Sequence, residues 1–421
     1  MQIGKPQLES IVQALTVILP ARQPADAALH HFFREHKNLG SRDRALIADT
    51  VYAALRRRRY LEHVTPEATP REIALAALVK VQGVGIGQIE SALTPAEKAW
   101  LVALKSEPAE ALPFEVQADL PDWVIALLRK QYSDEEILAL ARSLQQPAPL
   151  DLRVNSLKAP REAVLEKFDR DNIVAVPTKL APWGVRLREK PALNKYVLFT
   201  EGVVEVQDEG SQLLGLLMEP RRGEMIVDFC AGAGGKTLQM GAAMASQGRL
   251  YAFDISEKRL TNLGPRLKRS GLSNVHPQRI ANENDAKVKR LRGKIDRVLV
   301  DAPCTGLGTL RRNPDLKMRQ AETAVAELNV KQRNILDAAA ALVKPGGRLV
   351  YGTCSLLEAE NEAIVTAFLA SHPDFALVPA KDVFKRLGIE VEGTGDYMHL
   401  LPHRHDTDGF FAAVLQRSAT P

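Results

Sequence analysis

The sequence has few cysteines and no long apolar run. Only three of its 421 residues are cysteine, and no two of them form a C-x-x-C pair, which argues against a disulfide framework and against a zinc site. No segment approaches the roughly 20 apolar residues of a membrane span, and no secretory leader is recognisable at the start. We therefore expect a cytoplasmic protein with free thiols, no metal and no membrane attachment.

The sequence also has only a small excess of positive over negative side chains, 56 against 51. The net charge is only +5, which is weak evidence for a polyanionic partner. Four consecutive arginines, residues 56–59, cannot all face inward on a helix, so some are available to a phosphate backbone. The alternative is that they stabilise a helix C-terminus through its dipole. Basic residues also gather at 287–294 and 311–319, and such runs are usually solvated faces.

The length of the chain indicates more than one domain. Apolar spacing predicts helices over the first 140 residues or so, and the prolines at 147 and 149 mark a boundary. From about Arg222 strands alternate with helices, which is typical of a doubly wound α/β sheet. We predict an all-α domain at 1–145, a small α+β segment at 146–215 and a Rossmann-like α/β domain at 216–421.

Within the third domain the apolar runs predict individual elements. Strands are expected at 225–229, 249–253, 275–280, 296–300 and 347–352, with a final strand at 409–415 that closes the sheet. Helices are expected between them, at 257–270, 322–342 and 358–370.

A glycine-rich loop follows the first of these strands. A phosphate-binding P-loop would need glycine where Cys230 stands, and a dinucleotide fingerprint would need a third glycine where Thr237 stands. An S-adenosylmethionine loop fits better, because Asp254 follows the next strand, where its carboxylate would accept hydrogen bonds from the ribose hydroxyls. The expected cofactor-binding residues are Cys230, Ala231, Gly232, Ala233, Gly234, Gly235, Lys236 and Asp254.

Two further cysteines lie after predicted strands. Cys304 follows the strand at 296–300, and Cys354 follows the strand at 347–352. A buried cysteine is usually a small hydrophobic residue, and Cys230 is interpreted in that way, as loop support whose backbone lines the cofactor pocket. Cys304 and Cys354 differ because they share the sheet edge with the glycine loop, where nearby charge and helix N-termini activate thiols.

Five motifs occur in an order that resembles the RsmB/Nop2/Sun family of RNA cytosine-C5 methyltransferases. The resemblance covers residues 147–421, with Ala233 standing where the family more often has proline. Arg153 and Asn155 resemble part of the small RNA-binding extension, and the N-terminal helices resemble, more loosely, a NusB-like domain. The motifs are residues 228–237 (DFCAGAGGKT), 301–306 (DAPCTG), 312–315 (RNPD), 352–355 (GTCS) and 360–362 (ENE).

The resemblance implies a role for each site residue. Cys354 is the nucleophile that adds to C6 of cytosine, and Cys304 assists release when the C5 proton leaves, as a base or through one. Asp301 bonds near N3 and the 4-amino group, at the border of the cofactor pocket, and Lys236 positions the loop and substrate groups. Thiolate addition makes C5 nucleophilic enough to accept a methyl group, and elimination then needs a proton acceptor.

One cofactor contact has two candidates. A polar residue after the third strand should face the adenine of S-adenosylmethionine. Asn282 fits by position and Asp285 fits by chemistry, and the sequence leaves both open.

The implied function is methylation of C5 of a cytosine in 16S ribosomal RNA, by a monomer that acts before the ribosomal subunit is fully assembled. One alternative is the same chemistry on transfer RNA or at another ribosomal site. Another is a non-catalytic RNA-binding or assembly factor that keeps the fold. Methylation of DNA is disfavoured. Its chemistry resembles a scheme in which the nucleophile is the cysteine of the Pro303-Cys304 pair, and that scheme would give Cys354 no role.

Overall fold

The computed structural model describes residues 2–106, 112–189 and 191–419. The chain forms two compact units. The first contains Met1–Pro147 together with Thr309–Glu322, and the second contains Ala148–Gly308 and Thr323–Pro421.

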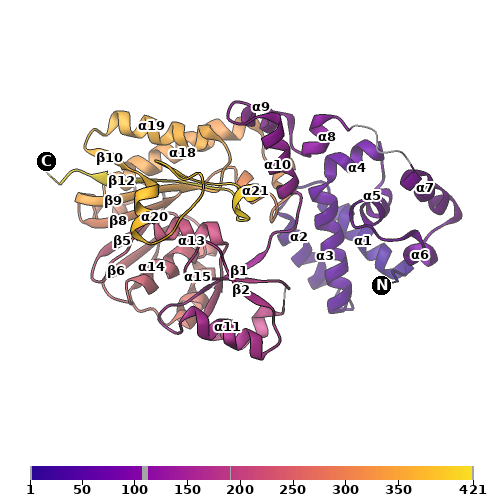
Figure 1. The fold of residues 1–421 in the computed structure, drawn as a ribbon, viewed down its shortest axis with the longest axis horizontal. Coiled ribbons are helices and arrows are strands. Elements are labelled where there is room, and N and C mark those ends of the chain that lie inside the picture. The colour runs from indigo at the N-terminus through magenta and orange to yellow at the C-terminus, as the bar shows by residue number, and fades with distance from the viewer. Residues whose placement is uncertain (1, 107–111, 190, 420–421) are drawn as a thin grey trace. The chain divides into compact units, whose positions relative to one another are not determined.

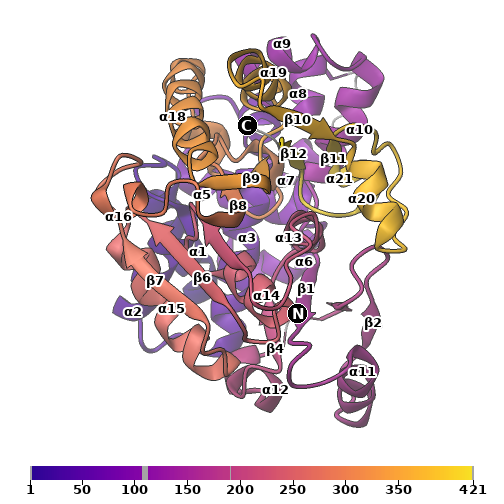
Figure 2. The same ribbon diagram turned by 90° about the vertical axis from the view of Figure 1, so that its left-hand side faces the viewer.

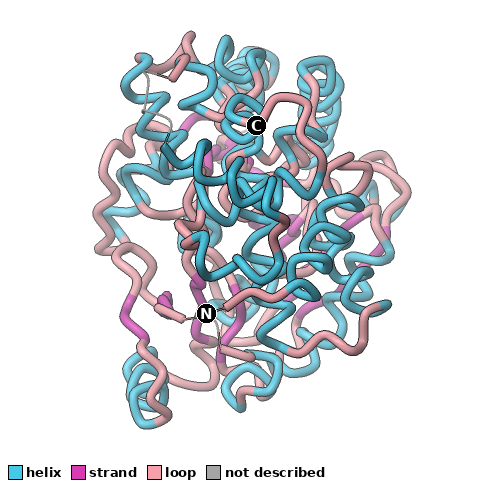
Figure 3. Tube along the Cα trace, turned by 90° about the vertical axis from the view of Figure 1, so that its right-hand side faces the viewer, coloured by secondary structure: helices cyan, strands magenta, loops and turns pink. Residues whose placement is uncertain are grey.

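The first unit is built from helices (Figures 1 and 3). Its core forms because apolar residues recur at helical spacing, as Leu8, Ile11 and Leu15 do on the buried face of α1. Its helices are α1 (Lys5–Ile18), α2 (Ala25–Glu35), α3 (Ser41–Arg56), α4 (Arg58–Val64), α5 (Pro70–Ala76), α6 (Ile86–Ile89), α7 (Pro95–Ser106), α8 (Phe114–Ala118), α9 (Asp122–Leu128) and α10 (Asp134–Leu144).

Thr309–Glu322 joins this helical unit although it is distant in sequence. The segment carries the short helix α17 (Leu316–Arg319), whose Met318 packs against the helical core. The Lys317 ammonium is buried and donates to Asp119 Oδ1 at 2.8 Å, and to the carbonyls of Arg56 and Asp119 at 2.8 and 2.9 Å. Burial lowers the pKa of Lys317 and outweighs the attraction of Asp119. The helical unit is therefore completed by residues encoded far downstream.

The second unit contains a small antiparallel sheet and a large sheet. The small sheet has the strand order β2-β3-β1-β4, and Phe168 and Val164 of α11 pack against its apolar face. Its elements are β1 (Leu150–Val154), α11 (Arg161–Arg170), β2 (Ala175–Pro177), β3 (Gly184–Leu187), α12 (Val197–Thr200) and β4 (Val204–Val206).

The large sheet has eight strands in the order β10-β12-β9-β8-β5-β6-β7, with β11 paired to β12 (Figure 2). The strands β5 to β9 are mutually parallel. The strand β12 is antiparallel to β9, and β10 and β11 are antiparallel to β12. The strands are β5 (Met225–Asp228), β6 (Arg249–Asp254), β7 (Val275–Arg279), β8 (Ile295–Asp301), β9 (Val343–Thr353), β10 (Phe375–Val378), β11 (Met398–Leu400) and β12 (Phe410–Arg417).

Helices cover both faces of the large sheet (Figure 1). Side chains alternate along a strand, so Ile226 of β5 packs with α13, α14 and α15, whereas Val227 packs with α18 and α19. The helices of this part are α13 (Glu209–Leu216), α14 (Gly235–Ala243), α15 (Glu257–Ser270), α16 (Ala286–Lys289), α18 (Glu322–Ala340), α19 (Glu362–Ser371), α20 (Ala380–Arg386) and α21 (Pro402–His405).

The predicted fold class is confirmed: a helical N-terminal region precedes a small α+β segment and a Rossmann-like α/β sheet. The strand predicted near the C-terminus is β12, but it lies between β9 and β10 and does not close the sheet. The likeness of the helical region to NusB stays a prediction. No helix within the described ranges is long and apolar enough to cross a membrane.

Candidate active site

The two thiols meet at the carboxyl edge of the large sheet. Cys354 directly follows β9, and Cys304 lies three residues beyond β8. Because β8 and β9 are parallel neighbours, their ends lie side by side, and the two Sγ atoms are 3.4 Å apart. The structure thus brings together the two cysteines that the sequence singled out.

The glycine loop follows β5, the other neighbour of β8. Gly234 caps α14 with a φ of 83°, and a Cβ at this position would lie 2.1 Å from Leu263 Cδ1. Only glycine fits there, because a side chain meets both the strained φ and the neighbouring leucine. Asp254 reaches the loop from the end of β6: its Oδ2 accepts from Gly232 N at 2.8 Å, and its Oδ1 accepts from Ser256 N at 2.7 Å.

An orphaned carboxylate oxygen lies beneath this loop. Asp228 Oδ2 accepts from Thr237 Oγ1 at 2.6 Å, but Asp228 Oδ1 is buried and has no partner. Burial raises the pKa of Asp228 to about 7, against the hydrogen bond from Thr237. An unpartnered buried acceptor is costly in a folded protein, so this position suits a donor such as an amino acid ammonium. The residues present therefore fit S-adenosylmethionine.

Lys236 and Asp301 form an ion pair between the loop and β8. Lys236 Nζ lies 2.7 Å from Asp301 Oδ2, and it lies over the ring of Phe410 at 5.4 Å from the centroid. Burial acts to lower the pKa of Lys236, but the attraction and hydrogen bond of Asp301 outweigh it, with help from Asp228 and Cys354, so the pKa is raised. The ammonium is thus a permanent cation at the site.

The environments of the cysteines differ. The hydrogen bond with Cys354, burial and the negative charges of Cys354 and Glu360 raise the pKa of Cys304 well above its usual range. Burial also raises the pKa of Cys230, assisted by Asp228 and Asp301. Cys230 is therefore a neutral, structural thiol, in agreement with its interpretation as loop support, and Cys304 rests as a thiol beside Cys354.

The two adenine candidates lie in the loop after β7. Asp285 caps α16 by accepting from Lys287 N and Ala281 N, both at 2.8 Å, and these bonds lower its pKa. Asn282 is exposed, and its side-chain oxygen accepts from Asn284 N at 2.9 Å. Asp285 is thus committed to its own loop, while Asn282 presents its side chain to solvent.

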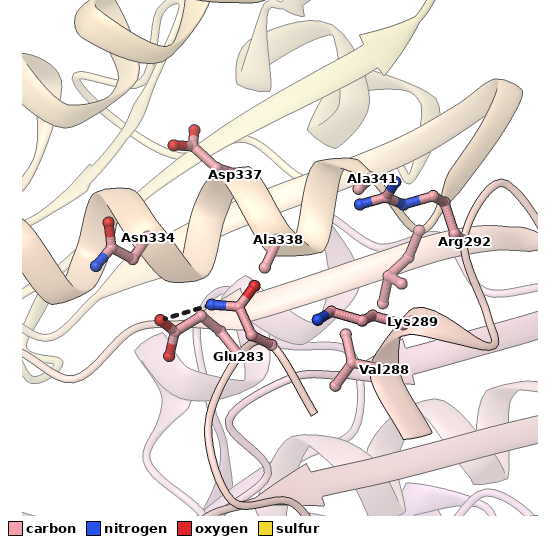
Figure 4. A pocket seen from close by; sticks show the side chains of 10 residues that line it. Glu283, Val288, Lys289, Arg292, Asn334, Asp337, Ala338 and Ala341 are labelled. Atoms are coloured by element: carbon pink, nitrogen blue, oxygen red, sulfur yellow. Dashed lines mark hydrogen bonds between the residues drawn. The ribbon is translucent and has the colours of Figure 1, made fainter. Parts of the chain in front are cut away.

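The same loop borders an open cavity of about 370 Å³ (Figure 4). The cavity lies between α16 and α18, and its lining mixes Lys289 and Arg292 with Glu283 and Asp337. Neither thiol lines it, and neither do Asn282, Asp285 and Asp254. The cavity is therefore separate from the site at the sheet edge.

Two features of the site were not predicted from the sequence. Glu360 is completely buried and accepts hydrogen bonds from residues next to both thiols. Ile255 directly follows Asp254 and is 64% exposed, so a large apolar side chain faces solvent next to the expected ribose contact. The sequence does contain a signal for Ile255: a large apolar residue directly follows the acidic residue at the end of β6. That position could have identified it as a site residue.

Within the described residues, no group of three or more His, Cys, Asp or Glu side chains is placed to hold a metal ion. The candidate site therefore consists of thiols, one lysine, carboxylates and backbone groups.

Two family models match the chain. The model described as 16S rRNA methyltransferase RsmB/F matches residues 215–416, and a ferredoxin-like domain of RsmF/B-like methyltransferases matches residues 120–194. A Synechocystis protein named probable ribosomal RNA small subunit methyltransferase B is 36% identical over 310 residues, which are 73% of this chain and 69% of the relative. A Bacillus subtilis protein of the same name is 27% identical over 394 residues, 93% of this chain and 87% of that relative.

Solved structures share the fold. The crystal structure of PH0851 aligns with a TM-score of 0.80 at 27% identity, covering 99% of this chain and 100% of that chain. A methyltransferase homologue from Pyrococcus horikoshii aligns with a TM-score of 0.57 at 27% identity, covering 70% of this chain and 99% of its own.

Proposed function

Because this chain belongs to the RsmB/F family of 16S rRNA methyltransferases, we propose that it methylates C5 of a cytosine through a covalent bond between Cys354 and C6. The chain is an S-adenosylmethionine-dependent RNA methyltransferase. The covalent mechanism is supported by the two thiols, whose Sγ atoms lie 3.4 Å apart at the sheet edge that holds the cofactor loop. A cysteine with a purely structural role would not need a second thiol beside it.

The cofactor supplies an electrophilic methyl group when it is bound. Asp254 binds the ribose hydroxyls, the backbone of the glycine loop lies against the cofactor, and Asp228 Oδ1 accepts from its ammonium group. Ile255 covers the adenine from one side, and Asn282 is the candidate for its polar edge. Three observations support these roles: the unpartnered Asp228 Oδ1, the contact of Asp254 with the glycine loop, and the exposed side chain of Ile255.

Cys354 Sγ adds to C6 as a thiolate, and the electrons of the C5–C6 double bond then make C5 nucleophilic. Asp301, held by Lys236 at 2.7 Å, bonds near N3 and the 4-amino group and stabilises the charge of the adduct. After C5 is methylated its proton must leave. The electrons of that C–H bond restore the double bond, and the Sγ–C6 bond breaks. Cys304 assists this release: it acts as the base once it has lost its own proton, or it acts through another base.

Substitution of the two cysteines tests this mechanism. In Cys354→Ala no adduct forms, so methylation and covalent RNA linkage are both lost. In Cys304→Ala the adduct forms but resolves slowly, so a protein–RNA band survives a denaturing gel. The control is Cys230→Ala, which should keep the release step intact. A trapped band from Cys354→Ala and none from Cys304→Ala would reverse the assignment.

The proposed substrate is 16S ribosomal RNA, as the names of the relatives indicate. Attack at C6 requires a base that is out of its stack, so the target is a splayed single-stranded or loop cytosine. We expect free 16S RNA to be a better substrate than the assembled small subunit. Bisulfite mapping of ribosomal RNA from a strain without the protein should show one unmodified cytosine, and an unchanged map would exclude this substrate.

The proposal also assigns RNA selection to the helical residues 1–145, with contacts from the small segment 146–215. No thiol or cofactor motif lies in residues 1–145, and these residues belong to a separate compact unit. A fragment of residues 146–421 should bind S-adenosylhomocysteine but lose affinity for ribosomal RNA, with a shallower salt dependence. A fragment that methylates ribosomal RNA as well as the full chain at the same salt would contradict this assignment.

A further inference from the structure

Glu360 is a buried carboxylate directly behind the thiols. Its exposed fraction is 0%, and it ends the short turn Glu358–Glu360 that precedes α19. Its backbone is also held, because Tyr351 Oη donates to the Glu360 carbonyl at 2.7 Å. An ionised carboxylate is rarely placed so deep without compensating hydrogen bonds, so its partners indicate what it does.

Four donors surround the carboxylate. Thr305 gives two of them: its backbone N–H reaches Oε1 at 2.9 Å and its hydroxyl reaches Oε2 at 2.6 Å. The hydroxyl of Ser355 donates to Oε2. The amide of Gln332 donates to Oε1 at 3.1 Å and also to the carbonyl of Pro303 at 3.0 Å. Oε1 accepts from two N–H groups and Oε2 accepts from two hydroxyls, so all four hydrogen bonds end on one carboxylate.

These donors flank the reacting sulfur atoms. Thr305 is the residue after Cys304, and Ser355 is the residue after Cys354. Consecutive Cα atoms are a fixed distance of about 3.8 Å apart, so an anchor on each neighbour restrains the position of each thiol. One carboxylate therefore connects two loops that lie 50 residues apart in the sequence.

We propose that Glu360 is a positioning residue that holds the Cys304 and Cys354 loops together, so that addition at C6 and release at C5 occur on one bound base. The proposal rests on the covalent mechanism proposed above. The four hydrogen bonds of the Glu360 carboxylate go to Thr305, Gln332 and Ser355 and not to a sulfur atom. Glu360 therefore acts on the thiols through Thr305 and Ser355.

The charge of Glu360 has a second consequence. It contributes, after the Cys354 hydrogen bond, burial and the Cys354 charge, to the raised pKa of Cys304. A negative group near Cys304 disfavours a second thiolate next to Cys354. The thiolate form is therefore disfavoured at Cys304, the sulfur that the proposed mechanism does not use for addition.

The test compares Glu360→Gln with Glu358→Gln, a control in the same turn whose side chain is exposed. We expect Glu360→Gln to reduce the methylation rate about tenfold or more, because the four hydrogen bonds lose their charged acceptor and the two hydroxyls must turn to accept from the amide. Its affinity for S-adenosylhomocysteine should stay unchanged in calorimetry, and Glu358→Gln should match the wild type in both measurements. A wild-type rate for Glu360→Gln would overturn the proposal.

Alkylation without RNA gives a readout that does not depend on the covalent mechanism. Iodoacetamide labelling, followed site by site by mass spectrometry across pH, should show Cys304 reacting at lower pH in Glu360→Gln than in the wild type. Glu360→Asp keeps the charge but shortens the reach, so it should keep the wild-type labelling profile and still lose methylation. An unchanged Cys304 profile in Glu360→Gln would contradict the role of the charge, whatever happens to the RNA adduct.

If Glu360→Gln does not fold, Ser355→Ala tests whether Glu360 holds the Cys354 loop. It removes the Ser355 donor to Glu360, together with the contacts of that hydroxyl with Thr305 Oγ1 and Leu357 N. We expect a several-fold slower methylation with unchanged S-adenosylhomocysteine binding. A wild-type rate in Ser355→Ala would count against the proposal, because the Cys354 loop would then need no anchor on Glu360.

Discussion

The helical unit and the catalytic part of the second unit use their charged side chains in opposite ways. In the helical unit the four arginines 56–59 are half-buried and bound to groups of the same unit. Arg56 donates to the carbonyl of Arg311, Arg57 pairs with Asp119, Arg58 with the carbonyl of Leu19 and with Glu62, and Arg59 with the carbonyl of Leu120 and with Asp122.

The catalytic site is the reverse case. Its charges are few, but one oxygen of Asp228 lacks a partner, and Lys236 is held next to a carboxylate and a thiol. The comparison shows that a dense run of charged residues is a poor indicator of a binding or catalytic site. The structure favours a structural role for residues 56–59 over contact with a phosphate backbone. The feature that sets the site apart is a buried carboxylate oxygen without a partner at the end of β5, while Lys236 is paired with Asp301.

The largest effect that would sharpen this contrast is expected from Asp254→Ala. It removes the anchor of Gly232 and, in the proposed function, the acceptor of the ribose hydroxyls. Hydrogen bonds to a charged acceptor contribute about 1.5–3 kcal/mol each, so S-adenosylhomocysteine binding should weaken by roughly 3 kcal/mol in calorimetry. RNA affinity should change little, and Glu257→Ala, an exposed neighbour, is the control. An unchanged dissociation constant would remove Asp254 from the pocket.

A second effect, on stability and not on binding, is expected from Lys317→Met in the helical unit. The change leaves Asp119 buried with one cation fewer, and breaking a buried pair in this way costs about 3–5 kcal/mol at most. Urea unfolding followed by circular dichroism should show a clear loss of stability. Arg319→Met, on the same short helix but more exposed, should cost less than about 1 kcal/mol. Equal losses for the two variants would contradict the structural role of Lys317.

The raised pKa of Asp228 should make the stability of the protein depend on pH. The pKa of Asp228 is raised from 3.8 to about 7, so the folded protein binds the proton more tightly than the unfolded chain. This contribution to stability is complete below about pH 4 and is lost as the pH rises through about 7. Asp228→Asn should therefore raise the unfolding temperature of the cofactor-free protein more at pH 8 than at pH 5. The exposed control Asp337→Asn should show no such difference, and a pH-independent effect of Asp228→Asn would refute the assignment.

The smallest effect is expected from Arg58→Ala. Its guanidinium is bound within the helical unit, so the salt dependence of RNA binding should equal that of the wild type, with only a slight loss of thermal stability. A salt slope lower by about one unit would mean that Arg58 neutralises a phosphate.

Most of the large sheet could be predicted because its parallel strands are short apolar runs that end in loops. The strand β9 is longer than expected: Pro345, Gly346 and Gly347 indicate a turn, yet the strand already begins at Val343, which pairs with Ile295 across an irregularity. The strands β10 and β11 were not predicted. They are only four and three residues long, and they are defined by pairing with β12, which a local pattern does not contain.

Site residues could be predicted where a reactive or polar group lies at or just after the end of a strand. This holds for Cys304, Cys354, the glycine loop and Asp254. Site residues could not be predicted where long-range contacts give a residue its role. Glu360 meets Thr305 across 55 residues, and the two lie in separate motifs. The assignment of Thr309–Glu322 to the helical unit likewise depends on packing, because its own residues resemble any basic loop.

That shared segment affects how the protein is made. Pro147, the last residue of the first stretch of the helical unit, is synthesised 170 residues before Lys317, the partner of Asp119. At about 5–20 residues per second, the helices wait roughly 10–35 s on the ribosome for the segment that completes them. Stalled nascent chains ending before residue 309 should be cleaved by protease in the helical unit more readily than chains stalled well beyond residue 322. The N-terminal unit is thus the first to leave the ribosome, but its last segment is made only after residues 148–308 of the second unit.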